Sequence, residues 1–112
     1  MYNNRRATLA YIKNKILTAS PVERLLMTYE AALAACHKQE TDRASAAIAS
    51  LINALEFDQN SELALGLRRL YTYCIEQINL GTFEEAAFIM KELRDTWEQA
   101  GKVADSRHNA KG

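Results

Sequence analysis

Residues 16–30 read ILTASPVERLLMTYE, and this stretch decides where the main helical part of the fold begins. Ser20 can act as an N-cap, Pro21 fits the first helical position because it has no N–H to lose, and Glu23 completes a capping box. The stretch therefore predicts a helix from about Pro21 to His37. Its apolar residues recur at the helical spacings of three and four, and they are Val22, Leu25, Leu26, Tyr29, Leu33 and Cys36.

Three more segments repeat this period, at about Arg43–Glu56, Glu62–Asn79 and Phe83–Ala100. A second capping box, Thr82–Glu85, precedes the last of them, which turns polar from Gly101 onward and should fray there. The apolar stripes are Ala44, Ala47, Ile48, Leu51, Ile52 and Leu55; then Leu63, Leu67, Leu70, Tyr71, Cys74 and Ile78; then Phe83, Ala86, Met90, Leu93, Trp97 and Ala100. Four amphipathic helices with short connections predict an all-α fold, an antiparallel up-down four-helix bundle.

The chain divides into three parts on the same evidence. Residues 1–18 form an N-terminal segment, in which residues 1–10 are polar and expected to be mobile. Residues 11–18 are apolar but too short to stand alone as a helix. Its apolar residues, Tyr11, Ile12, Ile16 and Leu17, suit it to dock on the bundle and cap a groove there. Residues 19–105 form the bundle, and residues 106–112 a polar tail.

Composition excludes several classes of function. With 14 basic and 14 acidic residues among 112, the formal net charge is zero, which argues against a nucleic-acid partner because phosphate binding needs a positive field. No apolar run approaches the roughly 20 residues that span a membrane, and the N-terminus lacks the apolar segment of a secretory signal. We expect a cytoplasmic protein that does not insert into membranes.

Neither catalysis nor metal binding is indicated by the residue pattern. Cys36 and Cys74 fall on apolar stripes and should be buried free thiols, which a reducing cytosol preserves. Carboxylate pairs such as Glu84 and Glu85 lie on predicted solvated faces, where general acid–base chemistry is not expected. We expect no catalytic residue, no metal site and no cofactor.

Surplus apolar residues point instead to a binding surface. Phe88 and Leu65 lie away from the apolar stripes of their helices, and Tyr73 and Ile75 flank a stripe on both sides. Several such residues on adjacent helices indicate a groove for another segment. Two alternatives remain: residues 11–18 cover this surface, or the protein self-associates through it as a weak homodimer.

Three ordered stretches resemble the FliS family. The first is the leader with Tyr11 and Ile16, followed by Thr-Ala-Ser-Pro, Leu-Leu-Met and Tyr-Glu. Residues 62–73, ELALGLRRLYTY, are similar to the family pattern Glu-x-Ala-x-Asn-Leu-x-x-Leu-Tyr-x-Tyr, although Gly66 stands where the family usually has Asn. Residues 93–97, LRDTW, are similar to its Leu-Arg-x-x-Trp.

The resemblance implies an export chaperone. FliS proteins bind the disordered C-terminal segment of flagellin in the cytoplasm, prevent premature polymerisation and help deliver it to the flagellar type III export apparatus. In the family the client wraps around a helical bundle in apolar grooves, and the segment before Thr-Ala-Ser-Pro, matched here by Tyr11 and Ile16, moves when the client binds. Helix-in-groove binding needs small residues and apolar anchors. Candidates are Ala46 and Ala49 on the second bundle helix and Leu65, Tyr71 and Tyr73 on the third.

Two other functions stay open at this point. A helical-bundle secretion chaperone for another client would use the same grooves. A structural homodimeric bundle would use the exposed apolar stripe and ignore a flagellin peptide.

Overall fold

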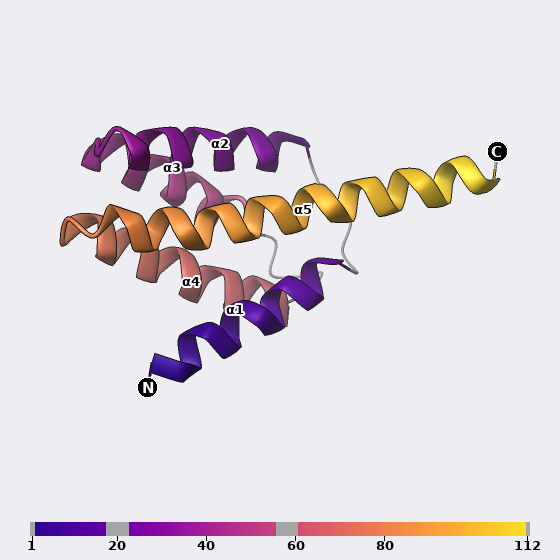
Figure 1. The fold of residues 1–112 in the computed structure, drawn as a ribbon, viewed down its shortest axis with the longest axis horizontal. Helices are drawn as coiled ribbons and strands as arrows, with labels where there is room; N and C mark the ends of the chain where they lie inside the picture. The colour runs from indigo at the N-terminus through magenta and orange to yellow at the C-terminus, as the bar shows by residue number, and fades with distance from the viewer. Residues whose placement is uncertain (1, 18–22, 56–60, 112) are drawn as a thin grey trace.

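The computed structural model describes residues 2–17, 23–55 and 61–111. These residues form five α-helices and no strand, so the predicted all-α class is confirmed. The helices are α1 (Tyr2–Leu17), α2 (Glu23–His37), α3 (Thr41–Asn53), α4 (Ser61–Asn79) and α5 (Phe83–Lys111) (Figure 1). The predicted cap at Ser20 and Pro21 lies outside the described residues.

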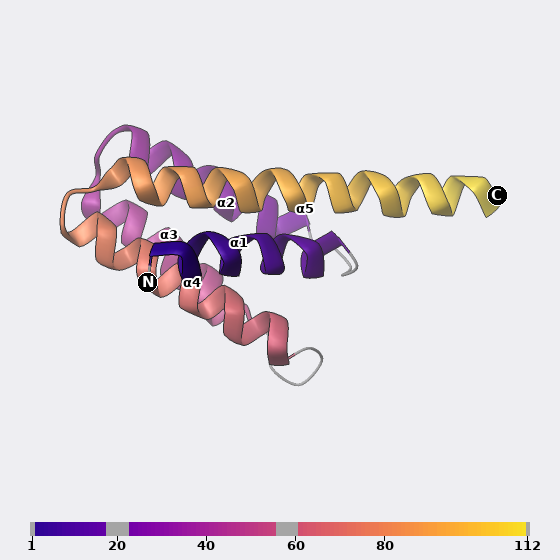
Figure 2. The ribbon, with the colours of Figure 1, turned by 60° about the horizontal axis from the view of Figure 1, so that its bottom comes forward.

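The helices pack around one another in a ring with a fifth member outside it. Helix α2 packs against α3 and α5, α3 against α4, and α4 against α5. Helix α1 packs against α4 and α5, and Figure 2 shows it lying between them. The C-terminal half of α5 projects beyond the other helices, which gives the chain its longest dimension of 48 Å (Figure 1).

The core lies where the predicted stripes meet. Tyr29 of α2, Tyr71 of α4 and Trp97 of α5 are all buried. The stripe predicted for α4 is buried along its whole length, and that of α5 is buried from Ala86 to Ala100. These stripes are therefore confirmed, and they position α4 and α5 as the pair on which α1 rests.

The N-terminal segment is helical in the structure, which the sequence did not predict. Residues Tyr2–Leu17 form one continuous helix of 16 residues. Leu9, Ile12 and Ile16, spaced by three and four, are buried against the bundle. An isolated helix of this length is marginal in water, so the packing on α4 and α5 supplies the stability that local sequence does not.

Two of the predicted helices also have different bounds in the structure. Helix α3 occupies Thr41–Asn53 instead of Arg43–Glu56, and it begins after Glu40, whose side chain makes no capping hydrogen bond. Helix α5 continues past Gly101 to Lys111, so the predicted fraying at Gly101 is wrong. A glycine costs a helix about 1 kcal/mol relative to alanine, which does not end a helix that is anchored by the preceding buried turns.

The two described hairpin turns close with the same backbone motif. In the α4–α5 turn, the N–H of Thr82 donates to the carbonyl of Gln77 (2.8 Å) and the N–H of Gly81 to that of Ile78 (3.0 Å). Gly81 has φ 85°, a left-handed conformation that suits glycine. In the α2–α3 turn Gln39 takes the equivalent place with φ 56°. Both are Schellman motifs, and they bring the helices on either side of each turn together.

Candidate partner-binding surface

Two of the predicted site residues line one groove between α1 and α4. Tyr11 of α1 is 42% exposed and Leu65 of α4 is 45% exposed, and both border an open hollow of about 430 Å³. The full lining is Ala7, Thr8, Tyr11, Ile12, Glu62, Leu65, Gly66 and Arg69. The structure therefore brings together an aromatic and an aliphatic side chain from segments more than 50 residues apart in sequence.

Two other predicted site residues lie in the interior. Ile16 is fully buried beneath α1. Tyr71 is also fully buried, and its hydroxyl is hydrogen-bonded to that of Tyr29, which in turn accepts a hydrogen bond from Trp97 Nε1 at 3.2 Å. In this structure Tyr71 holds α4 to α2 and is not accessible to a partner.

Tyr73, Ala46 and Ala49 lie outside the α1–α4 groove. Tyr73 is half-buried, and its hydroxyl donates to Glu85 Oε2 at 3.0 Å, which links α4 to α5. Ala46 is exposed and Ala49 half-buried on α3, a helix that packs against α2 and α4. The predicted site residues thus fall on more than one surface, and their part in binding stays a prediction.

The contact between Ile12 and Gly66 is the feature of this site that sequence reasoning missed. A Cβ atom on Gly66 would lie 2.1 Å from Ile12 Cδ1 and 3.1 Å from its Cγ1. Glycine inside a helix weakens it and usually marks a close approach of another segment. Gly66, in the middle of a leucine-rich helix, was the available signal, although it did not reveal which side chain approaches.

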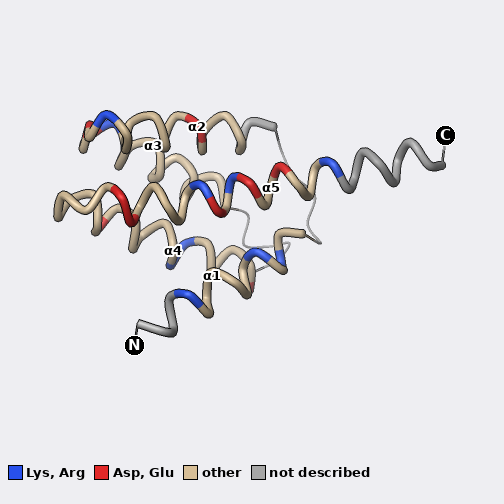
Figure 3. Tube along the Cα trace, in the orientation of Figure 1, with Lys and Arg blue, Asp and Glu red and all other residues tan. Residues whose placement is uncertain are grey.

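Basic side chains of α1 meet acidic and aromatic side chains of the bundle. Lys13 Nζ lies 2.7 Å from Glu92 Oε1 on α5, and Lys15 Nζ lies 3.9 Å from Glu62 Oε2 on α4. Figure 3 shows basic positions on α1, with no acidic position among its described residues, and both acidic and basic positions on the middle of α5. Electrostatic attraction therefore adds to the apolar packing that holds α1.

The partly exposed ring of Phe88 on α5 also contacts α1, through Arg6. Phe88 was predicted to point away from its stripe, and it is 38% exposed. The guanidinium carbon of Arg6 lies 4.4 Å from the centroid of this ring. A cation over an aromatic face at this distance is attracted to it, so Phe88 anchors the N-terminal half of α1.

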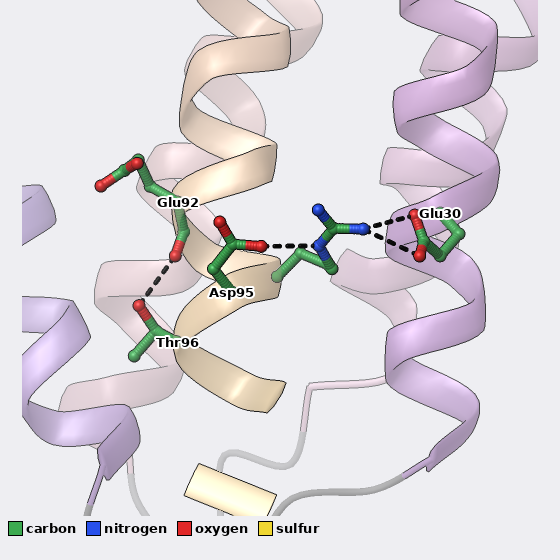
Figure 4. Close-up of polar contacts among 5 residues, drawn as sticks. Glu30, Glu92, Asp95 and Thr96 are labelled. Carbon is green, nitrogen blue, oxygen red and sulfur yellow. Dashed lines mark hydrogen bonds and ion pairs between the residues drawn. The ribbon is translucent and has the colours of Figure 1, made fainter. Parts of the chain in front are cut away.

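The opposite side of α5 is tied to α2 by a separate set of polar contacts (Figure 4). Arg94 Nη1 donates to both carboxylate oxygens of Glu30 at 2.8 Å, and its Nε donates to Asp95 at 2.8 Å. On the same helix, Thr96 Oγ1 donates to the carbonyl oxygen of Glu92 at 2.7 Å. Helix α5 therefore uses one face for α2 and another for α1.

The buried titratable groups are kept in their neutral forms. Burial raises the pKa of the Cys36 thiol and raises the pKa of the Cys74 thiol far above its ordinary value. Desolvation likewise raises the pKa values of Tyr29 and Tyr71. A thiol is nucleophilic only as a thiolate, so these cysteines act as small apolar residues. Both are free and buried, as predicted.

The part of the chain that the structure describes contains neither a metal-binding cluster nor a membrane-spanning helix. Within residues 2–17, 23–55 and 61–111, no three His, Cys, Asp or Glu side chains gather closely enough to hold a metal ion. No helix in the same ranges combines the length and the apolar character that crossing a bilayer requires.

Comparison with known proteins gives one match. The chain matches the family model FliS, described as flagellar protein FliS, over residues 37–104, which is more than half of its 112 residues. No curated protein and no solved structure matches the chain. The matched range begins at the end of α2 and includes α3, α4 and most of α5. Helices α4 and α5 are the two against which α1 packs.

Proposed function

The chain belongs to the FliS family of flagellar export chaperones, and on that basis we propose that its client is flagellin. It binds the disordered C-terminal segment of newly made flagellin in the cytoplasm and prevents premature polymerisation. It then helps deliver the client to the flagellar type III export apparatus. The observation that carries this proposal is the family match over residues 37–104.

The structure supports a helix-in-groove mode of binding. The proposal takes α2 to α5 as the antiparallel up-down bundle and α1 as a cover on two of its helices. An amphipathic client helix needs an apolar floor with side chains that can interdigitate with its own. Leu65 of α4 is partly accessible beside α1, and Tyr73 on the same helix is half-buried. The small residues Ala46 and Ala49 offer a second place for close approach on α3.

Helix α1 acts in this proposal as an intramolecular competitor of the client. Ile16 is buried on the bundle while Tyr11 stays partly exposed, so α1 covers an apolar surface that would otherwise face water. Folding a disordered client costs about 2–5 kcal/mol or more of the gross interaction energy. Competition lowers the apparent affinity further, by the fraction of molecules in which α1 is undocked. The chaperone would bind tightly only when the client offers enough apolar surface to meet both costs.

Co-expression with flagellin from the same genome tests the proposal. We expect the two proteins to co-purify as a one-to-one complex, as judged by mass in solution. Flagellin without its C-terminal segment is the matched control and should not co-purify.

A different outcome would favour one of the alternatives. A homodimer that ignores full-length flagellin would support a structural bundle. Retention of the truncated flagellin would show that the C-terminal segment is not the client site.

A further inference from the structure

We propose that the hollow between α1 and α4 is a docking site for a short segment of a partner protein, in which one acidic residue adjoins two aliphatic residues. One side of the hollow is formed by each helix, so the segment binds only while α1 lies on the bundle. This partner is therefore distinct from the client. Its effect on flagellin binding rests on the proposed function, whereas the site itself does not.

The contacts between α1 and α4 order the hollow from one end to the other. At one end, Lys15 Nζ lies 3.9 Å from Glu62 Oε2. In the middle, Ile12 packs directly on Gly66, so the two helices approach each other closely there. Arg69 marks the other end. It follows Glu62 by seven residues, which places the two ends about 10 Å apart along α4 at 1.5 Å per residue.

The two ends differ in the charge that they offer to a partner. Arg69 is exposed, and its guanidinium has no hydrogen-bond or ion-pair partner within residues 2–17, 23–55 and 61–111. Glu62, at the opposite end, is paired with Lys15. A carboxylate forms strong charge-assisted hydrogen bonds with a guanidinium, whereas a carboxylate beside Glu62 is repelled. The hollow therefore fits a segment with its acidic residue at the Arg69 end.

The middle of the hollow is apolar and partly open to water. Tyr11 from α1 and Leu65 from α4 border it, and each is more than two-fifths exposed. Exposed apolar side chains that gather from two elements are typical of an interaction site. An extended segment advances about 3.3 Å per residue, so a length of about 10 Å accommodates three residues. One acidic and two aliphatic residues match the charge and the apolar surface of the hollow.

The position of the hollow couples this partner to the client. A segment that contacts both α1 and α4 stabilises the arrangement in which α1 is docked. By thermodynamic linkage, it lowers the affinity for any client that requires α1 to leave, and the client lowers the affinity for the segment by the same factor. The partner therefore recognises the chaperone in its client-free form.

The first test titrates the isotope-labelled full chain with the peptide acetyl-GDLLG-amide and follows the backbone amide signals by nuclear magnetic resonance. We expect saturable shifts that are largest in residues 7–12 and 62–69. The control peptides acetyl-GKLLG-amide and acetyl-GDSSG-amide reverse the charge and remove the aliphatic side chains, respectively. Each should bind at least about threefold more weakly. Equal binding of the three peptides, or shifts centred on other residues, would overturn the proposal.

Matched substitutions assign the binding to the hollow. Arg69→Gln should weaken binding of acetyl-GDLLG-amide about three- to fivefold. Arg68→Gln should not, because Arg68 is an equally exposed neighbour that does not line the hollow. Leu65→Ser should weaken binding, whereas Leu80→Ser, at a 75% exposed position after α4, should not. Equal losses in the two arginine variants would show a general charge effect and contradict the proposal. Shifts of the same signals on raising the protein concentration alone would identify a second copy of the chain as the occupant, which would also contradict it.

The second test measures the coupling without any client. Hydrogen exchange reports how often α1 leaves the bundle. At ten times its dissociation constant, acetyl-GDLLG-amide should slow exchange of the α1 amides by about tenfold and leave those of α2 less affected. Unchanged exchange in α1 would show that the peptide does not require docked α1, and the proposal would fail.

A flagellin C-terminal peptide separates failure of this inference from failure of the proposed function. It should bind the full chain more weakly when acetyl-GDLLG-amide is present at saturation. If it binds equally well with and without that peptide, the flagellin function stands and the coupling fails. If it binds in neither case while exchange in α1 slows as expected, the docking site stands and the flagellin function fails.

Discussion

The interior enclosed by α2, α4 and α5 and the layer that α1 adds outside α4 and α5 are held together by different kinds of contact. The interior buries Tyr29, Tyr71 and Trp97, whose polar atoms bond to one another. The α1 layer combines three aliphatic side chains with partly exposed charges. Separating large aromatic residues with buried polar groups costs much free energy. We expect a helix such as α1, held by aliphatic side chains and partly exposed charges, to be exchanged more easily for another helix. We therefore expect the interior to stay folded while the α1 layer is replaced.

Alkaline pH should give the largest effect, and it should act on the interior. Tyr29, Tyr71 and Cys74 are neutral when protonated, and burial raises the pKa of each in the folded chain above its value in the unfolded chain. The stabilisation is therefore complete below about pH 8 and is lost as the pH rises through the ordinary values of about 8.5 for Cys and 10 for Tyr.

The expected loss of stability becomes steeper as the pH rises. Each group contributes about 1.4 kcal/mol per pH unit once the unfolded chain is deprotonated, so the three together approach about 4 kcal/mol per unit above pH 10. Urea unfolding between pH 7 and 11 measures this loss. Unchanged stability at pH 11 would mean that these groups reach water in the folded chain.

Trp97→Ala should give the largest effect of a single substitution. Trp97 is 5% exposed and donates from its indole nitrogen to Tyr29, and truncating a buried tryptophan costs about 3–5 kcal/mol. Phe88→Ala on the same helix is the control and should cost far less, because Phe88 is more than one-third exposed. Equal losses of unfolding free energy would place Trp97 outside the core and remove the distinction between the two regions.

Tyr71→Phe should give a smaller loss that sharpens the assignment of Tyr71 to the interior. The change removes the hydroxyl that bonds to Tyr29 and should cost about 1–3 kcal/mol of unfolding free energy. Binding of a flagellin C-terminal peptide should not change, since Tyr71 is fully buried. Weaker binding with unchanged stability would instead assign Tyr71 to the client site.

Sequence alone was sufficient for the interior because its signal is local. Positions such as Leu67, Tyr71 and Cys74 repeat at helical spacing, and that repetition identifies the buried face without knowledge of the partner helix. The start of α5 at Phe83 was predicted for the same reason, since the capping box Thr82–Glu85 is a local feature.

Sequence was insufficient for the α1 layer because its signal is tertiary. Residues 2–10 are mostly polar and predict no helix. They are nevertheless helical in the structure, where Leu9 and Ile12 of α1 are buried and α1 packs against α4 and α5. Tyr11 and Leu65 were each predicted as binding residues, but nothing in their neighbourhoods shows that they border the same hollow. The contact of Ile12 with Gly66 depends on which face of α1 packs against which face of α4, and only the fold gives that information.

Deleting residues 1–17 should have the smallest effect on the fold and tests the comparison most directly. Helices α2 to α5 pack against one another without α1, so circular dichroism should still show a cooperatively melting helical protein. A flagellin C-terminal peptide should bind at least as tightly as to the full chain, because the competitor is gone. The free truncated protein should also associate more readily, since the apolar surface beneath Ile12 and Ile16 is uncovered. Calorimetry of both proteins against the same peptide measures the difference. If truncation abolishes binding while the helices stay folded, α1 is part of the client site, and the layer that we describe as replaceable is a permanent component of it.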